Sequence, residues 1–178
     1  MKGIIVYKSA YGSTAQYADW LKADLGFDCI TADQTESIDW KSYQTIIIGC
    51  PVIMNKPFLA SWIKENWNAI RHARVFLYTT SGAAPHSSAL MAGYHASLPE
   101  EVRQKLTYLP LPGRFDYGNM RFMHKLMLQI GALIQKDPKT RSRMRSDMRN
   151  PIDKVERIAL LPLIDAVDHK QTIAGGVS

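Results

Sequence analysis

Residues 4–14 read Ile4-Ile5-Val6-Tyr7-Lys8-Ser9-Ala10-Tyr11-Gly12-Ser13-Thr14. An apolar run ends here in a turn of small and hydroxyl-bearing residues, and a helical pattern begins directly after it. Such a turn exposes backbone N–H groups, and the N-terminus of the next helix adds unpaired N–H groups and a positive dipole end. Gly12 allows a close approach that a side chain would obstruct, and Ser9, Ser13 and Thr14 add hydroxyl donors. The turn therefore predicts a phosphate site, with a plain helix cap as the competing interpretation.

Two common nucleotide motifs are absent from this turn. It contains neither G-x-G-x-x-G nor G-x-x-x-x-G-K-[ST]. Dinucleotide and ATP binding of those types is therefore disfavoured.

Short apolar segments alternate with helical patterns along the chain. Strands are predicted at residues 3–7, 28–32, 45–49, 74–80 and 106–111, and helices at 14–25, 57–71 and 87–105, the last broken near Ser97-Leu98-Pro99. The strands are continuously apolar, which is typical of strands covered on both faces. The alternation predicts an α/β fold with a doubly wound parallel sheet. Residues 33–43 fit either a short helix or a loop, and residues 152–167 predict a final helix bent by Pro162.

Composition indicates one domain. The chain has 178 residues, of which 46% are hydrophobic and 21% charged, an ordinary globular composition. We expect a single domain over residues 1–168, including a long insertion at 112–150, and a flexible tail at 169–178. Cys29 and Cys50 lie in or beside apolar runs, so a reducing, cytoplasmic compartment is expected. No apolar run approaches the roughly 20 residues of a membrane-spanning helix.

Ligands of open α/β sheets bind beyond the carboxyl ends of the strands. Three loops are expected to meet there, namely residues 8–14, 50–56 and 80–86. The second loop is unusually apolar and the third is made of small residues. An apolar wall beside a phosphate site suits a flat ring system.

With these loops in place, the chain resembles the flavodoxin-like family, whose phosphate loop has the pattern T/S-x-T-G-x-T. Here the loop reads Ser9-Ala10-Tyr11-Gly12-Ser13-Thr14, with Tyr11 in place of the usual threonine. The resemblance implies a five-stranded sheet of order 2-1-3-4-5, with the insertion after or within the fifth strand, and bound FMN. The implied phosphate contacts are Ser9, Ala10, Tyr11, Gly12, Ser13 and Thr14, and the implied ring contacts are Pro51, Val52, Ile53, Met54, Asn55, Thr80, Ser81, Gly82, Ala83 and Ala84. Since loops 50–56 and 80–86 contain no aromatic residue, the ring would pack on Pro51, Val52, Ile53, Met54 or backbone.

The segment from Gly113 to Tyr117, followed by an amphipathic helix, is similar to the insertion of flavodoxin-type, menaquinone-dependent protoporphyrinogen oxidases. The exit from the insertion departs from that group, because it reads Asp137-Pro138-Lys139-Thr140-Arg141. The resemblance implies an FMN-dependent enzyme that oxidises protoporphyrinogen, or a related reduced substrate, and passes electrons to a quinone. A flavodoxin-like electron carrier that docks a redox partner is the alternative.

The helix of this insertion has two distinct sides. Apolar residues fall on one side: Met120, Phe122, Met123, Leu126, Met127, Ile130, Leu133 and Ile134. Polar residues fall on the other, and a basic stretch follows: Arg121, Lys125, Gln129, Lys136, Lys139, Arg141, Arg143, Arg145 and Arg149. One interpretation is that the apolar side covers the sheet or a homodimer partner and that the cations are solvated. The other is that residues 119–149 contact an anionic membrane surface, on the inner face of the cell membrane, or an acidic amphipathic substrate such as a porphyrinogen.

Other classes of function are disfavoured. The arginine cluster lacks the interleaved aromatic residues of nucleic-acid sites, and the five histidines show no metal-ligand spacing with either cysteine. A phosphoacceptor signalling domain needs acidic residues after the first strand and an aspartate after the third, where Lys8-Ser9 and Gly49-Cys50 stand. Cys50 has no evident histidine partner, which favours a structural role. No residue stands out as a catalytic acid or base.

Overall fold

Five parallel strands form the centre of the molecule. The computed structural model describes residues 2–115, 117–118, 122–134 and 137–168, so the predicted tail at 169–178 lies outside the described residues. The strands are β1 (Gly3–Tyr7), β2 (Asp28–Thr31), β3 (Thr45–Ile53), β5 (Arg74–Ser81) and β6 (Leu106–Pro112). Their spatial order is β2-β1-β3-β5-β6. The predicted doubly wound α/β fold with strand order 2-1-3-4-5 is confirmed.

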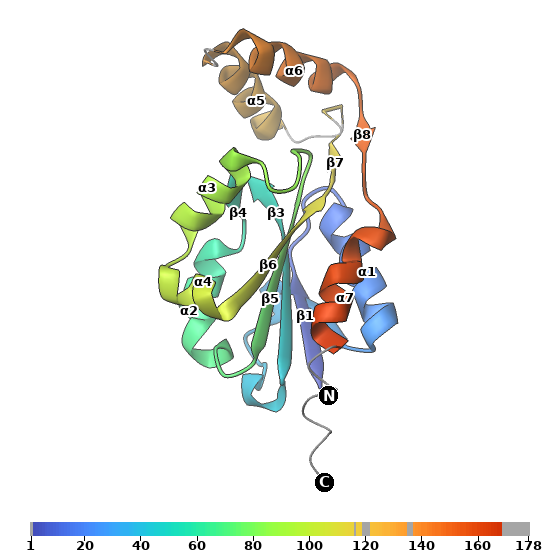
Figure 1. Cartoon of the computed structure of the whole chain (residues 1–178), viewed down its shortest axis with the longest axis vertical. Coiled ribbons are helices and arrows are strands. Elements are labelled where there is room, and N and C mark those ends of the chain that lie inside the picture. The colour runs from blue at the N-terminus through green and yellow to red at the C-terminus, as the bar shows by residue number, and fades with distance from the viewer. Residues whose placement is uncertain (1, 116, 119–121, 135–136, 169–178) are drawn as a thin grey trace.

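Helices cover both faces of the sheet (Figure 1). Helices α1 (Ser13–Leu25) and α7 (Leu161–Asp168) lie on one face, and α2 (Ala60–Ile70), α3 (Ser88–Ser97) and α4 (Glu100–Lys105) lie on the other. Successive strand residues point to opposite faces, so Ile4 and Ile46 pack toward α2, while Ile5 and Ile47 pack toward α1 and α7. All four side chains are fully buried. This burial on both faces is the reason for the continuous apolar runs.

The segment predicted as a loop at 50–56 is instead a β-hairpin. Strand β3 continues to Ile53, and β4 (Lys56–Pro57) pairs with it in antiparallel register. The two turn residues, Met54 and Asn55, have φ angles of 52° and 62°. Two successive left-handed residues are what a two-residue hairpin turn requires, since that turn matches the twist of the paired strands. The apolar wall of the site is therefore a strand rather than a flexible loop.

Two further segments refine the predictions. The predicted break near Ser97-Leu98-Pro99 is confirmed, because α3 ends at Ser97 and α4 begins at Glu100. Residues 33–43, left open between helix and loop, contain two short 3-10 turns, η1 (Ala32–Gln34) and η2 (Trp40–Ser42), separated by irregular chain.

The single helix predicted at 152–167 is wrong. Residues 152–153 form strand β8 (Ile152–Asp153), and a 3-10 turn, η3 (Arg157–Leu160), leads into α7. Pro162 does not bend a helix: it lies in the first turn of α7, where a missing N–H leaves no hydrogen bond unmade. Ile158 is 67% exposed and lies in η3, before the α-helix starts at Leu161.

The insertion follows β6 and returns before η3. Its two ends pair as an antiparallel ribbon of β7 (Arg114–Phe115) and β8, with Arg114 opposite Asp153 and Phe115 opposite Ile152. Between these ends lie α5 (Phe122–Ile134) and α6 (Pro138–Arg149), which Figure 1 places beyond the carboxyl ends of the strands. Among the described helices, none combines the length and the apolar character needed to cross a bilayer.

The contact between α3 and the hairpin generates a stability prediction. A Cβ added at Gly93 would lie 1.5 Å from the backbone oxygen of Asn55. Gly93→Ala should therefore push α3 away from the β3–β4 turn and lower the free energy of unfolding by about 1–3 kcal/mol. Helix propensity alone would raise stability by about 1 kcal/mol, so urea unfolding distinguishes the two effects by sign. Ala96→Ser, at an exposed position of α3, is the control, and a stabilised Gly93→Ala protein would contradict the packing.

Candidate functional site

The first turn of α1 is built to accept an anion. Gly12 has φ +87° and precedes Ser13, the first residue of α1, without a side chain that could cap the helix. The Gly12 N–H donates to Ser9 Oγ at 3.1 Å, which closes the turn. The first N–H groups of a helix have no partner inside the helix, and Gly12 brings no side chain to cap them. Those groups and the helix dipole can therefore bind a phosphate.

The hydroxyl groups of this turn also hold other segments. Thr14 Oγ1 lies 2.9 Å from Thr80 Oγ1 at the end of β5, and both residues are buried. Ser13 Oγ accepts the backbone N–H of Arg114 at 2.9 Å. The predicted phosphate loop is thereby tied to the predicted third loop and to the first residue of the insertion ribbon.

Tyr78, a buried residue of β5, also holds this turn in place. Its hydroxyl donates to the Thr14 carbonyl at 3.0 Å, and its ring is fully buried. The ring passes directly over Gly49 of β3, where an added Cβ would come within 2.2 Å of it. Burial raises the pKa of Tyr78 well above its ordinary value, so the hydroxyl keeps its proton and acts as a donor.

A cavity of about 100 Å³ lies beside these contacts. It is lined by Ala10, Tyr11, Ser13, Thr14, Pro51, Val52, Ile53, Thr80, Ser81, Gly82, Gly113, Arg114 and Phe115. Each of the three predicted segments thus contributes residues to the lining of this cavity. A larger hollow of about 490 Å³ lies at the other end of the strands, beside Phe27 and Tyr43, away from the phosphate turn.

Six of the predicted contact residues do not line the cavity: Ser9, Gly12, Met54, Asn55, Ala83 and Ala84. Ser9 and Gly12 form the hydrogen bond that closes the turn next to the cavity. Met54 and Asn55 occupy the tip of the hairpin, where Met54 is 73% exposed, and their contact with the ring stays a prediction. Ala83 and Ala84 are exposed residues after β5.

Gly113, Arg114 and Phe115 also line the cavity, although the sequence did not predict them as site residues. They follow β6, whose carboxyl end reaches the same sheet edge as the three predicted loops, and that position was the available signal. Phe115 supplies the aromatic side chain that loops 50–56 and 80–86 lack. It packs on Gly82, since a Cβ at Gly82 would lie 3.1 Å from Phe115 Cβ.

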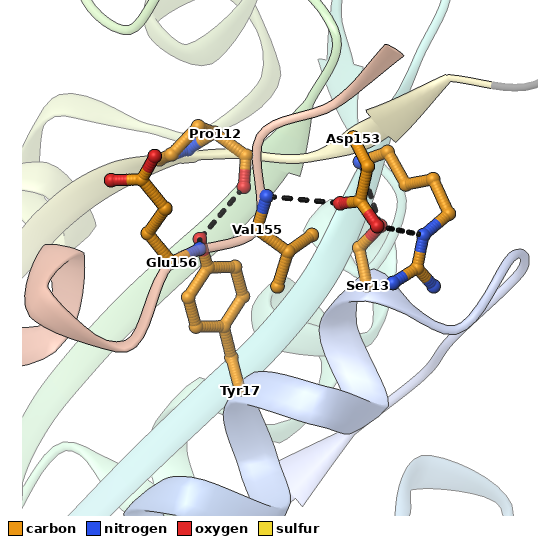
Figure 2. Close-up of polar contacts among 7 residues, drawn as sticks. Ser13, Tyr17, Pro112, Asp153, Val155 and Glu156 are labelled. Carbon is orange, nitrogen blue, oxygen red and sulfur yellow. Dashed lines mark hydrogen bonds and ion pairs between the residues drawn. The ribbon is translucent and has the colours of Figure 1, made fainter. Parts of the chain in front are cut away.

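Figure 2 shows how the ends of the insertion are fastened to α1. The Tyr17 hydroxyl donates to the Pro112 carbonyl at 2.9 Å and accepts the Glu156 N–H at 3.2 Å. The Asp153 carboxylate accepts from Val155 N at 3.1 Å and from Arg114 Nε at 2.8 Å. These two contacts lower the pKa of Asp153, the backbone contact being the larger cause.

The residues of the cavity wall can bind and orient a ligand. Among the described residues they include hydroxyls, apolar side chains and one guanidinium, but no carboxylate, imidazole or thiol. The helix N-terminus fits a phosphate, and Pro51–Ile53 with Phe115 fit a flat ring. The cavity is smaller than the roughly 300–1,000 Å³ of most ligand pockets, so a ring system would lie at its mouth or displace Phe115. Within the described part of the chain, no three His, Cys, Asp or Glu residues gather closely enough to hold a metal ion.

Cys50 has the properties of a structural residue. It is fully buried, and burial raises the pKa of its thiol to about 12. At pH 8 about one thiol in 10,000 would then be ionised, and the thiolate is the reactive form. We predict that iodoacetamide leaves Cys50 unmodified in the folded protein at pH 8 and alkylates it in urea, as read by peptide mass spectrometry. Rapid alkylation of Cys50 without urea would contradict this assignment.

Gly12 generates a prediction for ligand affinity. A β-branched side chain at φ +87° costs on the order of 1–3 kcal/mol of backbone strain and obstructs the turn. Gly12→Val should therefore raise the dissociation constant for FMN about tenfold or more, as measured by fluorescence titration. Gly26→Val is the matched control, because Gly26 has φ +66° at the other end of α1 with no atom within 4 Å of an added Cβ. Equal FMN affinity in the Gly12 variant and the unaltered protein would remove the phosphate turn from the site.

Several solved structures are similar to this chain. A flavoprotein from Lactobacillus acidophilus NCFM in complex with FMN is 17% identical, with 62% of this chain and 91% of that chain covered and a TM-score of 0.46. A flavodoxin from the domain Archaea is 14% identical, with coverages of 84% and 95% and a TM-score of 0.45. The Trp repressor binding protein from Bacillus subtilis is 12% identical, with coverages of 63% and 85% and a TM-score of 0.47.

The sequence itself identifies the family. No curated protein sequence matches the chain. The family described as Flavodoxin domain matches residues 4–142, from β1 through α5 and into α6. Together with the strand order and the turn at the start of α1, this match covers most of the molecule and both sides of the cavity. The chain therefore belongs to the Flavodoxin domain family and is a flavodoxin-like, FMN-binding protein.

Proposed function

We propose that this chain is an FMN-dependent oxidoreductase that oxidises protoporphyrinogen, or a related reduced tetrapyrrole, and passes the electrons to a quinone. The observation that carries the proposal is the position of the insertion. Its first strand, Arg114–Phe115, lies in the wall of the cavity, and the insertion bears an exposed apolar helix beside a basic one. A surface suited to an amphipathic substrate is thus joined to the flavin site.

The residues of the site would hold FMN in two parts. The phosphate would rest on the turn of residues 9–14 and the first N–H groups of α1. The ring would lie beside Pro51–Ile53 and Phe115. FMN supplies the redox chemistry, since its ring accepts electrons from a reduced donor and delivers them to an acceptor. The protein's task is to position the ring and to exclude water, which agrees with a wall whose described residues include no carboxylate, imidazole or thiol.

The four described large apolar side chains of α5 are exposed, whereas the smaller Ala132 is buried. Leu126 and Ile130 are 38% and 45% exposed, and Leu133 and Ile134 are 69% and 70% exposed. The other apolar residues predicted on this side, Met120, Phe122, Met123 and Met127, lie outside the described side chains. The interpretation that this side covers the sheet therefore fails for the four described residues, whereas a membrane, a substrate or a second copy of the chain could cover them.

Cations accompany this apolar surface. Lys139, Arg145 and Arg149 of α6 are exposed, and α6 packs against α5. Exposed apolar residues beside cations suit an anionic membrane surface such as the inner leaflet. Carboxylates of a tetrapyrrole would meet the same cations, and a lipid-dissolved quinone would be within reach. Each pair of electrons and protons removed from the substrate would reduce one quinone to a quinol.

The alternative is a flavodoxin-like electron carrier whose insertion docks a redox protein. The same exposed side of α5 supports it, because protein partners also bury such patches. Purified holoprotein distinguishes the two functions. The enzyme should form fluorescent porphyrin from porphyrinogen when a quinone is supplied, whereas the carrier should form none and should exchange electrons with a flavodoxin reductase.

A substitution on α5 tests the proposed surface. Leu133→Ser with Ile134→Ser should lower binding to anionic lipid vesicles, and turnover with a vesicle-bound quinone, by about tenfold or more, because burial of large apolar side chains drives such binding. FMN affinity and turnover with a water-soluble quinone should stay unchanged. Vesicle sedimentation and porphyrin fluorescence are the measurements.

Ile158→Ser is the matched control, since Ile158 is 67% exposed on η3, outside the insertion. Deletion of residues 119–149 should abolish vesicle binding and quinone-linked turnover together. Unchanged vesicle binding and turnover after this deletion would contradict the proposal. If the Leu133→Ser, Ile134→Ser variant differs from the unaltered protein only in oligomeric state, with vesicle binding and turnover unchanged, the α5 surface is a homodimer interface instead.

A further inference from the structure

Arg114 stands where the insertion meets the phosphate turn. Its backbone N–H donates to Ser13 Oγ at 2.9 Å, which fixes its Cα beside the first residue of α1. Its Nη1 lies 3.5 Å from the point that a Cβ of Gly12 would occupy. The guanidinium therefore lies against the one residue of the turn that has no side chain, at the positive end of α1.

A cation at this position needs a compensating negative charge. The N-terminus of a helix favours anions and disfavours cations, so the helix dipole opposes a guanidinium there. Asp153 supplies one carboxylate through the 2.8 Å contact with Arg114 Nε. The side chains of Arg114 and Asp153 remain 38% and 51% exposed. A guanidinium has five N–H donors, so the contact with Asp153 leaves donors for a second anion.

The ion pair also determines where those donors lie. Arg114 and Asp153 face each other across the β7–β8 ribbon, and Asp153 is itself held by the Val155 N–H. The guanidinium is thereby held at the turn instead of ranging through solvent. An arginine held in one place loses less entropy on binding an oxyanion than a free surface arginine would.

We propose that Arg114 is a phosphate ligand of the bound FMN, and that it makes this chain select FMN over riboflavin. The inference rests on the FMN binding of the proposed function and adds a charged residue to a turn otherwise made of backbone N–H and hydroxyl groups. Since Arg114 is the first residue of the insertion ribbon, the phosphate also holds the root of the insertion in place. Oxyanion binding by a guanidinium uses charge-assisted hydrogen bonds, which are stronger than neutral ones.

Calorimetric titration of the flavin-free full chain with FMN, riboflavin and inorganic phosphate tests this role. Arg114→Gln should raise the dissociation constant for FMN by about 10- to 100-fold and leave that for riboflavin unchanged. The dissociation constant of Arg114→Lys for FMN should lie between those of the unaltered protein and Arg114→Gln, because lysine keeps the charge without the planar guanidinium. Raising the salt concentration should weaken FMN binding to the unaltered protein more than to Arg114→Gln.

Arg157→Gln is the matched control. Arg157 forms an ion pair with Asp24 of α1 but does not line the cavity, so its loss should leave FMN affinity unchanged. Equal FMN affinity in the Arg114→Gln and unaltered proteins would overturn the phosphate role, and so would equal weakening of FMN and riboflavin binding by this substitution. If Arg114→Gln does not fold, Arg114→Lys decides: full FMN affinity in that variant would show that the positive charge alone suffices and would overturn a specific role of the planar guanidinium. An unaltered protein that binds neither flavin would instead overturn the proposed function itself.

Discussion

The candidate site depends on the way α1 begins. Gly12, in a left-handed conformation, turns the chain from β1 into the helix without capping it. Three residues of the first turns then hold four segments: Ser13 holds β7, Thr14 holds the end of β5, and Tyr17 holds both the end of β6 and the chain before η3. Each hydrogen bond contributes about 1 kcal/mol on its own. Their combined effect is positional, because the cavity walls made by β5 and by β7 are both anchored to the same helix N-terminus.

The insertion is therefore part of the site rather than an appendage. Its two ends form the β7–β8 ribbon, and the residues of β7 belong to the cavity wall. Any partner that shifts α5 and α6 acts on a ribbon that also touches the phosphate turn. Conversely, a ligand in the turn acts on the ribbon. This two-way connection is the physical basis of the proposal that the insertion contacts the substrate while the flavin carries out the redox chemistry.

Several features of the site were predictable from local patterns. The apolar run before Gly12 and the helical pattern after it located the phosphate turn, and the alternation of strands and helices located the edge where loops meet. The hairpin was not predictable from apolar character alone, because Pro51–Ile53 read equally as loop or strand. Its turn depends on left-handed angles at Met54 and Asn55. Phe115 was not predicted because its neighbour in space, Gly82, directly follows the end of β5 and is far away in sequence.

The sequence by itself determined the sheet and the turn, since both arise from periodicity and from residues close together in the chain. Burial of Ile4 and Ile5 on opposite faces follows from the strand period alone. Only the tertiary structure decided which distant groups complete the site. The meeting of Arg114 with Ser13, and of Asp153 with Arg114, spans 101 and 39 residues of sequence. Such contacts depend on where β6 and the chain before η3 come to lie against α1, and no local pattern encodes that placement.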